Sequence, residues 1–189
     1  MTPFSVGYFP PLHGHYLADY HPYYQSGTKA RNPAFDAHSQ AILNLKNPGK
    51  AYFGSGYQDL LAALRPVIPQ LRAPSEIVII PSSGQDQVSV GLSALARRIC
   101  ERRPEVTMRE GCLRRTTTIE KLSRGGDRSQ ITHLQSMQYT TAPNAPGVKI
   151  LFDDVTTTGN SLLAAATLIR AQEPHAEIVA FVLGKTVHA

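Results

Sequence analysis

Hydrophobic and polar residues follow a regular pattern in the second half of the chain. The runs 76–80, 148–152 and 178–183 are almost wholly apolar, which is typical of strands buried on both faces of a parallel sheet. Apolar positions at helical spacing predict helices over 88–99, after the first run, and over 161–171, after the second. Strand, turn, helix and strand in this order are the parts of right-handed βαβ units. The pattern therefore predicts an α/β fold with an open parallel sheet.

The rest of the chain has a different character. Residues 1 to about 50 are rich in Tyr, His, Pro and Asn, which predicts irregular structure or short strands, and helical spacing follows over 57–71. Residues 107–147 show little apolar periodicity, so a long hairpin or loop is expected, and in α/β folds such segments are usually functional. We expect an N-terminal hood over 1–73 and a core domain over 74–189 that carries a flexible lid hairpin.

Composition narrows the class of protein. With 42% hydrophobic and 17% charged residues, the 189-residue chain has the composition of a folded protein with one sizeable core. No apolar stretch reaches the roughly 18 residues that cross a membrane, and no basic start precedes an apolar run, so neither a membrane span nor a signal peptide is expected. Cys100 and Cys112 fit neither a disulfide framework nor a zinc ribbon, which favours reduced thiols and a cytoplasmic location.

The excess of positive charge lies in one window. Residues 97–128 hold ten Lys/Arg and five Asp/Glu, whereas the rest of the chain holds nine of each. Such a surplus suggests a polyanionic partner, either a phosphorylated small molecule or a nucleic acid. A solvated, arginine-rich helix end and loop is the alternative interpretation. No aromatic residue is interleaved in the window, so single-stranded nucleic acid is the less favoured partner.

The strongest chemical signal follows the apolar run 148–152. Asp153 and Asp154 come next, at the carboxyl edge of the predicted sheet, where open α/β sheets bind ligands. Residues 156–161, here named the threonine loop, contain four hydroxyl side chains and Gly159, and they open the following helix. Such a loop directs backbone N–H groups and the positive end of the helix dipole at one point, which suits a phosphate. An acidic pair beside it suits vicinal hydroxyls, so the segment indicates a sugar phosphate.

Two simpler interpretations explain less. A helix N-cap needs one hydroxyl rather than four, and it does not need an acidic pair. A nucleoside triphosphatase would carry a Gly-x-x-x-x-Gly-Lys-Ser/Thr loop, which the sequence lacks.

The segment 148–161 resembles the phosphoribosyl pyrophosphate (PRPP) motif of the type I phosphoribosyltransferases: an apolar strand, two acidic residues and a Thr-Thr-Gly-type loop. Residues 79–84 resemble the first core strand and pyrophosphate loop of that family; residues 82–84 are here named the serine loop. Residues 113–133 resemble the flexible loop that covers the site, and in this detail the ComF-like relatives of amidophosphoribosyltransferases are closest. The segment 42–46 resembles the short Lys-containing helix that those proteins carry upstream of the core.

The chain departs from the ComF-like pattern at two places. The cysteine-rich zinc ribbon at the start of many such proteins is absent from this sequence. Gln85-Asp86-Gln87 stands in place of their Arg-Gly-Phe-Asn-Gln-type sequence. A carboxylate at Asp86 would repel pyrophosphate unless it caps the helix or holds a metal ion.

The resemblance implies transfer of a phosphoribosyl group from PRPP to a nitrogen nucleophile, with Mg²⁺ bound through the pyrophosphate. The catalytic residues it implies are Asp153, Asp154, Arg115 and Lys121. The residues it implies for the 5-phosphate are Thr156, Thr157, Thr158, Gly159, Asn160 and Ser161. The residues it implies for the pyrophosphate are Ser82, Ser83, Gly84, Arg114 and Arg128.

Several alternatives stay open. The protein could be a non-catalytic PRPP or nucleotide sensor, or a ComF-like accessory protein in DNA uptake or processing. A homo-oligomer is compatible with the sequence, and no residue stands out as a base for the acceptor. His133 is a candidate for lining the site, and the tyrosines of the first 24 residues either stack a base or pack together. The histidines near the N-terminus lack carboxylates or cysteines at ligand-like spacing, so no protein-bound metal is expected.

Overall fold

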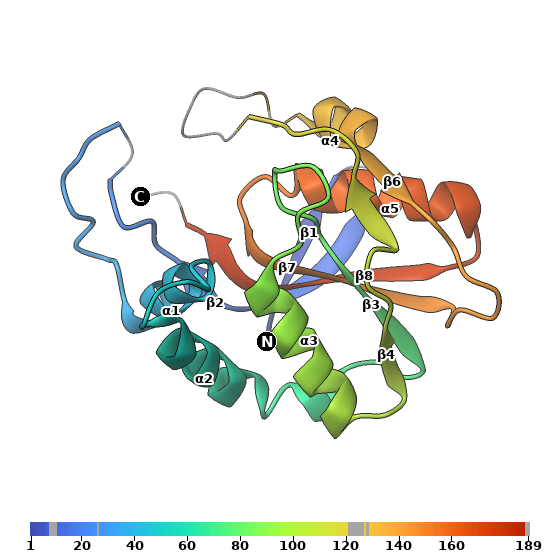
Figure 1. Ribbon diagram of the computed structural model, residues 1–189, viewed down its shortest axis with the longest axis horizontal. Helices are drawn as coiled ribbons and strands as arrows, with labels where there is room; N and C mark the ends of the chain where they lie inside the picture. Colours follow the sequence, from blue (N-terminus) through green and yellow to red (C-terminus); the bar gives the residue numbers. More distant parts are fainter. Residues whose placement is uncertain (8–10, 26, 121–126, 128, 188–189) are drawn as a thin grey trace.

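An open, mostly parallel sheet forms the centre of the computed structural model, which describes residues 1–7, 11–25, 27–120, 127 and 129–187 (Figure 1). Its six strands lie in the order β1-β2-β8-β7-β3-β4, and β1–β2 is its antiparallel pair. The elements are β1 (Thr2–Val6), β2 (Leu12–Tyr20), α1 (Ala37–Leu45), α2 (Phe53–Leu64), the 3₁₀ helix η1 (Ile68–Gln70), β3 (Ser75–Ile79), α3 (Val90–Arg102), β4 (Val106–Met108), β5 (Leu113–Arg115), α4 (Gln130–Ser136), β6 (Met137–Tyr139), β7 (Val148–Thr156), α5 (Asn160–Gln172) and β8 (Glu177–Thr186).

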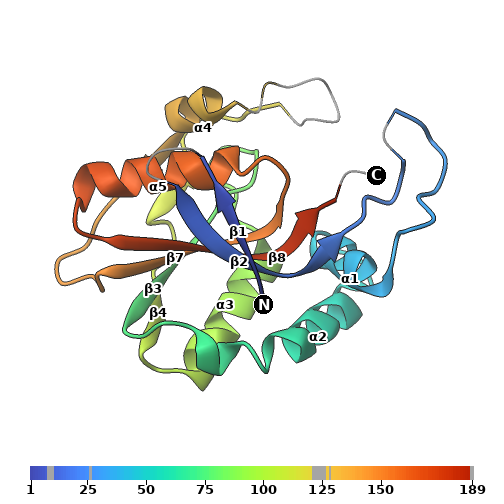
Figure 2. The ribbon, with the colours of Figure 1, turned by 180° about the vertical axis from the view of Figure 1, so that it is seen from behind.

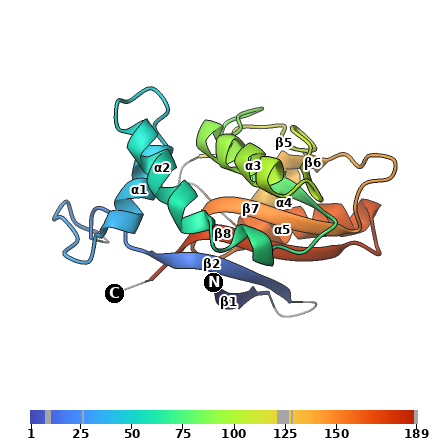
Figure 3. The same cartoon turned by 90° about the horizontal axis from the view of Figure 1, so that it is seen from below.

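Helices cover both faces of the sheet, as Figures 2 and 3 show. Along β7, Ile150 and Phe152 belong to the core under α1, α2 and α3, whereas Leu151 belongs to the core under α5. The same alternation runs along β3 and β8. Side chains of neighbouring strand residues point to opposite faces, so strands between two helical layers must be apolar at every position. This explains the three apolar runs and confirms the predicted α/β fold.

The predicted elements of the core are present with shifted ends. The helix expected from residue 88 begins at Val90, because Ser89 is its N-cap and accepts the Leu92 N–H. The strand expected to end at residue 152 continues to Thr156, because β8 extends to Thr186 and pairs alongside it. The helical spacing over 57–71 corresponds to α2 and η1, and Pro66 lies between them.

The N-terminal segment shares the sheet and core with the rest of the chain. β2 pairs in parallel with β8, and β1 forms the edge beyond it. α1 and α2 bury Ile42, Leu45, Leu60 and Leu64 in the same core as α3. Residues 1–73, expected as a hood, therefore contribute two strands to the sheet, two α-helices to the core on one face, and Phe4 and Leu12 to the core on the other.

The hairpin expected over 107–147 corresponds to the antiparallel pair β5–β6, with α4 leading into β6. Residues 121–126 and 128 of that segment lie outside the described part of the chain. None of the helices in the described ranges has the length and apolar character needed to cross a membrane.

Candidate functional site

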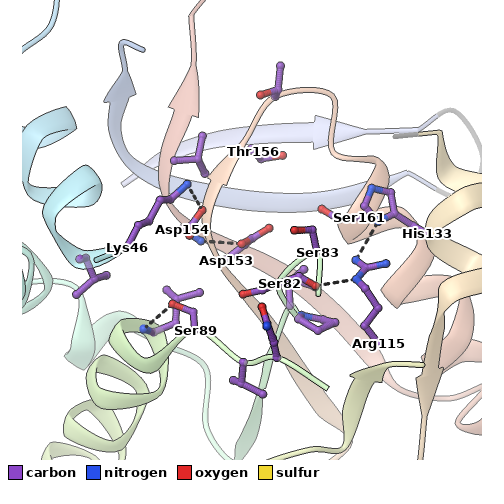
Figure 4. Close-up of a pocket in the computed structure, with 18 of the residues that line it drawn as sticks. Lys46, Ser82, Ser83, Ser89, Arg115, His133, Asp153, Asp154, Thr156 and Ser161 are labelled. Carbon is purple, nitrogen blue, oxygen red and sulfur yellow. Dashed lines mark hydrogen bonds and ion pairs between the residues drawn. The ribbon is translucent and has the colours of Figure 1, made fainter. Parts of the chain in front are cut away.

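A cavity of about 930 Å³ opens at the carboxyl edge of the sheet. Its walls come from the ends of β3 and β7, the first turns of α3 and α5, the end of α1, and single residues of β5 and α4 (Figure 4). Open α/β sheets bind ligands at this edge, because the strand ends and the helix N-termini converge there. The described residues include no comparable second cavity.

All six residues of the threonine loop line this cavity. Gly159 is the N-cap of α5 and has a φ of 77°, in the left-handed region that L side chains rarely adopt. A Cβ at Gly159 would lie 2.5 Å from Cγ1 of Val6 in β1, so the loop also packs closely on the edge strand. The first N–H groups of an α-helix have no partner within the helix, and the first two residues of α5, Asn160 and Ser161, belong to this wall.

Thr156 ends β7 and is 3% exposed. Its hydroxyl has no hydrogen-bond partner among the described residues, which is uncommon for a buried polar atom.

The acidic pair lies within β7 rather than beyond it, and both residues line the cavity. Oδ1 of Asp153 accepts the N–H of Asp154 at 2.8 Å, and Oδ1 of Asp154 lies 2.9 Å from Nζ of Lys46 (Figure 4). Burial lowers the pKa of Lys46, but the charge and the hydrogen bond of Asp154 outweigh it and raise that pKa above its usual value. Lys46 is therefore a cation at neutral pH.

Ser82 and Ser83 line the same cavity as the threonine loop, and the carbonyl group of each accepts a hydrogen bond from another segment of the chain. Arg115 Nε donates to Ser82 O at 2.7 Å, and the Ile119 N–H donates to Ser83 O at 2.9 Å. Gly84, the third residue of the serine loop, does not line the cavity; a Cβ there would lie 2.4 Å from the Gln87 carboxamide.

The two arginines of β5 have different environments. Arg115 is 1% exposed, lines the cavity, and donates to the carbonyl of Ser82 (Figure 4). It also donates to Ser136 Oγ. Arg114 is exposed, donates to Gln138 Oε1 at 2.9 Å, and does not line the cavity. Neighbouring residues of a strand point to opposite sides, so both could not reach one site. Lys121 and Arg128, expected in the same cationic lid, lie outside the described residues.

Asp86 does not line the cavity either. Its backbone has a φ of 52°, its N–H donates to Arg115 O, and its carboxylate lies 4.0 Å from the Arg114 guanidinium. The N-cap of α3 is Ser89 rather than Asp86. The carboxylate that would repel a bound anion is therefore outside the cavity wall.

Two lining residues complete the site. Lys46 received no role from the sequence, although it is the lysine of the segment 42–46 that was compared there with a Lys-containing helix. His133, weighed as a site-lining candidate, does line the cavity and contacts Arg115, with 3.3 Å between Nδ1 and NH2. Within the described residues, no cluster of three or more His, Cys, Asp and Glu side chains is arranged to hold a metal ion.

Comparison of the sequence with protein-family models and with curated proteins found no match. The geometry of the cavity is therefore what bears on function. The cavity combines a hydroxyl-rich helix N-terminus suited to one anion, a pair of carboxylates suited to sugar hydroxyls, and a second loop that contributes Ser82 and Ser83.

Proposed function

We propose that the protein binds PRPP in this cavity and transfers its phosphoribosyl group to a nitrogen nucleophile, with release of pyrophosphate. One observation carries the proposal: the threonine loop, the acidic pair before it, and Ser82 and Ser83 of the sequence-distant serine loop all line one cavity of about 930 Å³. A ribose carrying a phosphate at one end and a diphosphate at the other presents groups to all three. This assignment would make the chain a type I phosphoribosyltransferase, with the ComF-like branch as the nearest resemblance.

Each wall then has a role. The threonine loop binds the 5-phosphate through backbone N–H groups, hydroxyls and the N-terminus of α5. The carboxylates of Asp153 and Asp154 accept hydrogen bonds from the two ribose hydroxyls. Ser82 and Ser83 bind the pyrophosphate, and Arg115 fixes the serine loop from behind through the Ser82 carbonyl.

The residues of this site fit an Mg²⁺ ion that binds together with the substrate. The oxygens of the acidic pair and of the serine hydroxyls are the hard ligands that Mg²⁺ prefers, and Mg²⁺ usually takes the rest of its shell from phosphates and water. When bound, it supplies charge that stabilises the departing pyrophosphate.

The chemistry needs little from protein side chains beyond placement. Departure of pyrophosphate leaves positive charge on the ribose ring in a dissociative, oxocarbenium-like transition state. Fixed dipoles and carboxylates that hold the ribose, together with donors that meet the leaving group, lower the barrier to that step.

Calorimetric titration with PRPP and Mg²⁺ tests binding, and a screen of nucleobases, amines and ammonia for pyrophosphate release then tests turnover. We expect saturable binding of PRPP and Mg²⁺-dependent release of pyrophosphate with one class of nitrogen acceptor. Absence of PRPP binding by the folded protein would exclude the proposal.

A non-catalytic PRPP sensor is the second candidate, and one observation favours it. Of the cations expected at the leaving group, Arg114 does not line the cavity. Arg115 does line it, but it is 1% exposed and already donates to the Ser82 carbonyl and the Ser136 hydroxyl. A sensor would bind PRPP with comparable affinity and release no pyrophosphate with any acceptor.

A further inference from the structure

Lys46 reaches the acidic pair from a helix that is distant from it in sequence. It is the C-cap of α1, and Figure 4 shows its side chain extended from that helix toward Asp154. The 2.9 Å between Nζ and Asp154 Oδ1 is a charge-assisted hydrogen bond within the cavity wall. The function proposed above gives this lysine no role.

The position of Lys46 is fixed by the packing of α1 as well as by its ion pair. The Ser39 N–H donates to the Asp36 carboxylate at 2.8 Å, which caps the helix at its start. His38 Nε2 donates to Leu183 O at 2.8 Å and so attaches α1 to β8. Leu45, directly before the lysine, is buried in the core. The ammonium group is therefore presented by a rigid element rather than by a loop.

Two adjacent carboxylates create a problem for an anionic ligand. PRPP carries several negative charges, and like charges a few ångströms apart repel by about 1 kcal/mol even in water and more strongly in a partly enclosed cavity. A lysine cation on Asp154 reduces the net charge of the acidic pair by one. It also engages Oδ1 of that carboxylate, which leaves Oδ2 for a ribose hydroxyl.

We propose that Lys46 is a positioning residue of the PRPP site, which holds the Asp154 carboxylate in one orientation and offsets its charge against the anionic substrate. The inference rests on the proposed function and adds a part of the N-terminal segment to the site. Lys46 acts through Asp154 and does not itself contact the reacting atoms.

A double-mutant cycle tests this role through the dissociation constant of PRPP with Mg²⁺, measured by calorimetry on the full chain. Lys46→Met should weaken binding roughly five- to tenfold, and Lys46→Arg, which keeps the charge, should recover most of the loss. In an Asp154→Asn background, Lys46→Met should add less than about a twofold change, because its partner is already neutral. Lys50→Met removes a lysine charge from the exposed turn after α1 and outside the cavity, and serves as the matched control.

The outcomes separate the two proposals. If the wild-type protein binds PRPP and Asp154→Asn weakens it, but Lys46→Met does not, the role of Lys46 is wrong and the proposed function stands. An equal loss from Lys46→Met in both backgrounds also overturns it, since the lysine would then act independently of Asp154. If the wild-type protein does not bind PRPP, both proposals fail. Thermal unfolding accompanies each variant, and Lys46→Gln replaces Lys46→Met in the cycle if the apolar side chain prevents folding.

Discussion

At the scale of single residues, Gly159 is constrained in two independent ways. Its φ of 77° is unfavourable for L side chains by about 1–2 kcal/mol, and a Cβ would lie 2.5 Å from Val6 Cγ1. We expect Gly159→Val to abolish measurable binding of ribose 5-phosphate, because the loop backbone must change and β1 must move. Calorimetry measures the affinity, and urea unfolding shows whether the variant is folded.

Gly111 provides the matched control for this substitution. It has a φ of 70°, but nothing lies within 4 Å of its virtual Cβ, and it does not line the cavity. Gly111→Val should therefore show a comparable backbone penalty without the clash and with unchanged affinity for ribose 5-phosphate. A folded Gly159→Val protein with wild-type affinity would contradict the phosphate assignment.

The proposed position of the ribose hydroxyls depends on the acidic pair. Asp153→Asn with Asp154→Asn should weaken PRPP binding at least tenfold, because two charge-assisted hydrogen bonds of about 1.5–3 kcal/mol each become neutral ones. Calorimetry with PRPP and Mg²⁺ gives the affinity, and circular dichroism confirms the fold. Asp59→Asn, an exposed carboxylate on α2 outside the cavity, is the control and should bind as the wild type does. Unchanged affinity in the double variant would remove the ribose hydroxyls from this part of the cavity.

Local sequence was sufficient to locate the acidic pair and the threonine loop, because strand, loop and helix follow one another within 148–161. It was not sufficient for Lys46, whose partner Asp154 is brought to it by the packing of α1 on the sheet. Nor could it tell that Arg115 is buried, since this depends on Ser82 and Ser136, which come from separate parts of the chain.

At the scale of elements, the strands β3, β7 and β8 are predictable because each is buried on both faces, which leaves a local apolar signature. β2 has no such signature. Leu12 and Gly14 are buried, but the rest of the strand is partly or fully exposed, as expected near the edge of a sheet. The position of β2 in the sheet is set by its pairing with β8, at the other end of the chain. The local sequence of β2 does not indicate which strand it pairs with.

A buried ionic network joins the elements at the opposite end of the sheet from the cavity. Lys149 in β7 is completely buried, with Nζ at 2.7 Å from Glu76 and 3.0 Å from Glu173. Lys149→Met should destabilise the fold by about 3–5 kcal/mol, because it leaves two largely buried carboxylates without their shared cation. Urea unfolding measures the change, and Lys29→Met, at an exposed position, should change it little. A loss below about 1 kcal/mol would mean that Glu76 and Glu173 have adequate partners in Arg109 and Tyr139.

The same network gives stability a dependence on acid. Burial raises the pKa of Glu173, but hydrogen bonds from Tyr139, Thr141 and Lys149 outweigh this effect. The pKa of Glu173 therefore lies below its ordinary value of about 4.5. A carboxyl with a depressed pKa in the folded state stabilises the fold above its unfolded pKa, and the contribution is lost as the pH falls through the folded value. Unfolding followed from pH 6 to pH 3 should therefore show a loss of stability below about 4.5, and Glu173→Gln should flatten the curve there. An equally steep curve for Glu173→Gln would assign the acid sensitivity to other carboxyl groups.

At the scale of the whole molecule, the expected division into a hood and a core could not include the contacts between these two segments, because no local sequence pattern records such contacts. The composition of residues 1 to about 50 differs because this segment forms the edge strand β1, the partly exposed strand β2, turns and an exposed irregular stretch, rather than strands buried on both faces. Yet β2 and α1 complete the sheet and one of its cores, and α1 delivers Lys46 to the cavity. The cavity is therefore assembled from segments distant in sequence, which is why the contribution of Lys46 could not be derived from the motif alone.

Substitutions at two pairs of cations within the basic window 97–128 can distinguish the candidate functions. Arg97 and Arg102 are exposed on α3 and do not line the cavity, and Arg97 forms an ion pair with Glu110. Lys121 and Arg128 belong to the segment that resembles the lid. Replacing either pair by Ala removes the same charge, so each double variant is the control for the other.

If the protein is a phosphoribosyltransferase, the Lys121/Arg128 variant should lower kcat for pyrophosphate release far more than it weakens PRPP binding, since lid cations act mainly on the charge that develops on the leaving group. The Arg97/Arg102 variant should change neither quantity. If the protein instead binds DNA, both variants should flatten the log–log salt dependence of that binding by about 0.7–0.9 for each lost phosphate contact and leave PRPP untouched. Steady-state kinetics, PRPP calorimetry and DNA binding over a salt series distinguish these results, and we expect the first. Tight PRPP binding without pyrophosphate release for any acceptor, and without DNA binding, would contradict both and leave the sensor, because the cavity would then bind its ligand without lowering the barrier to its cleavage.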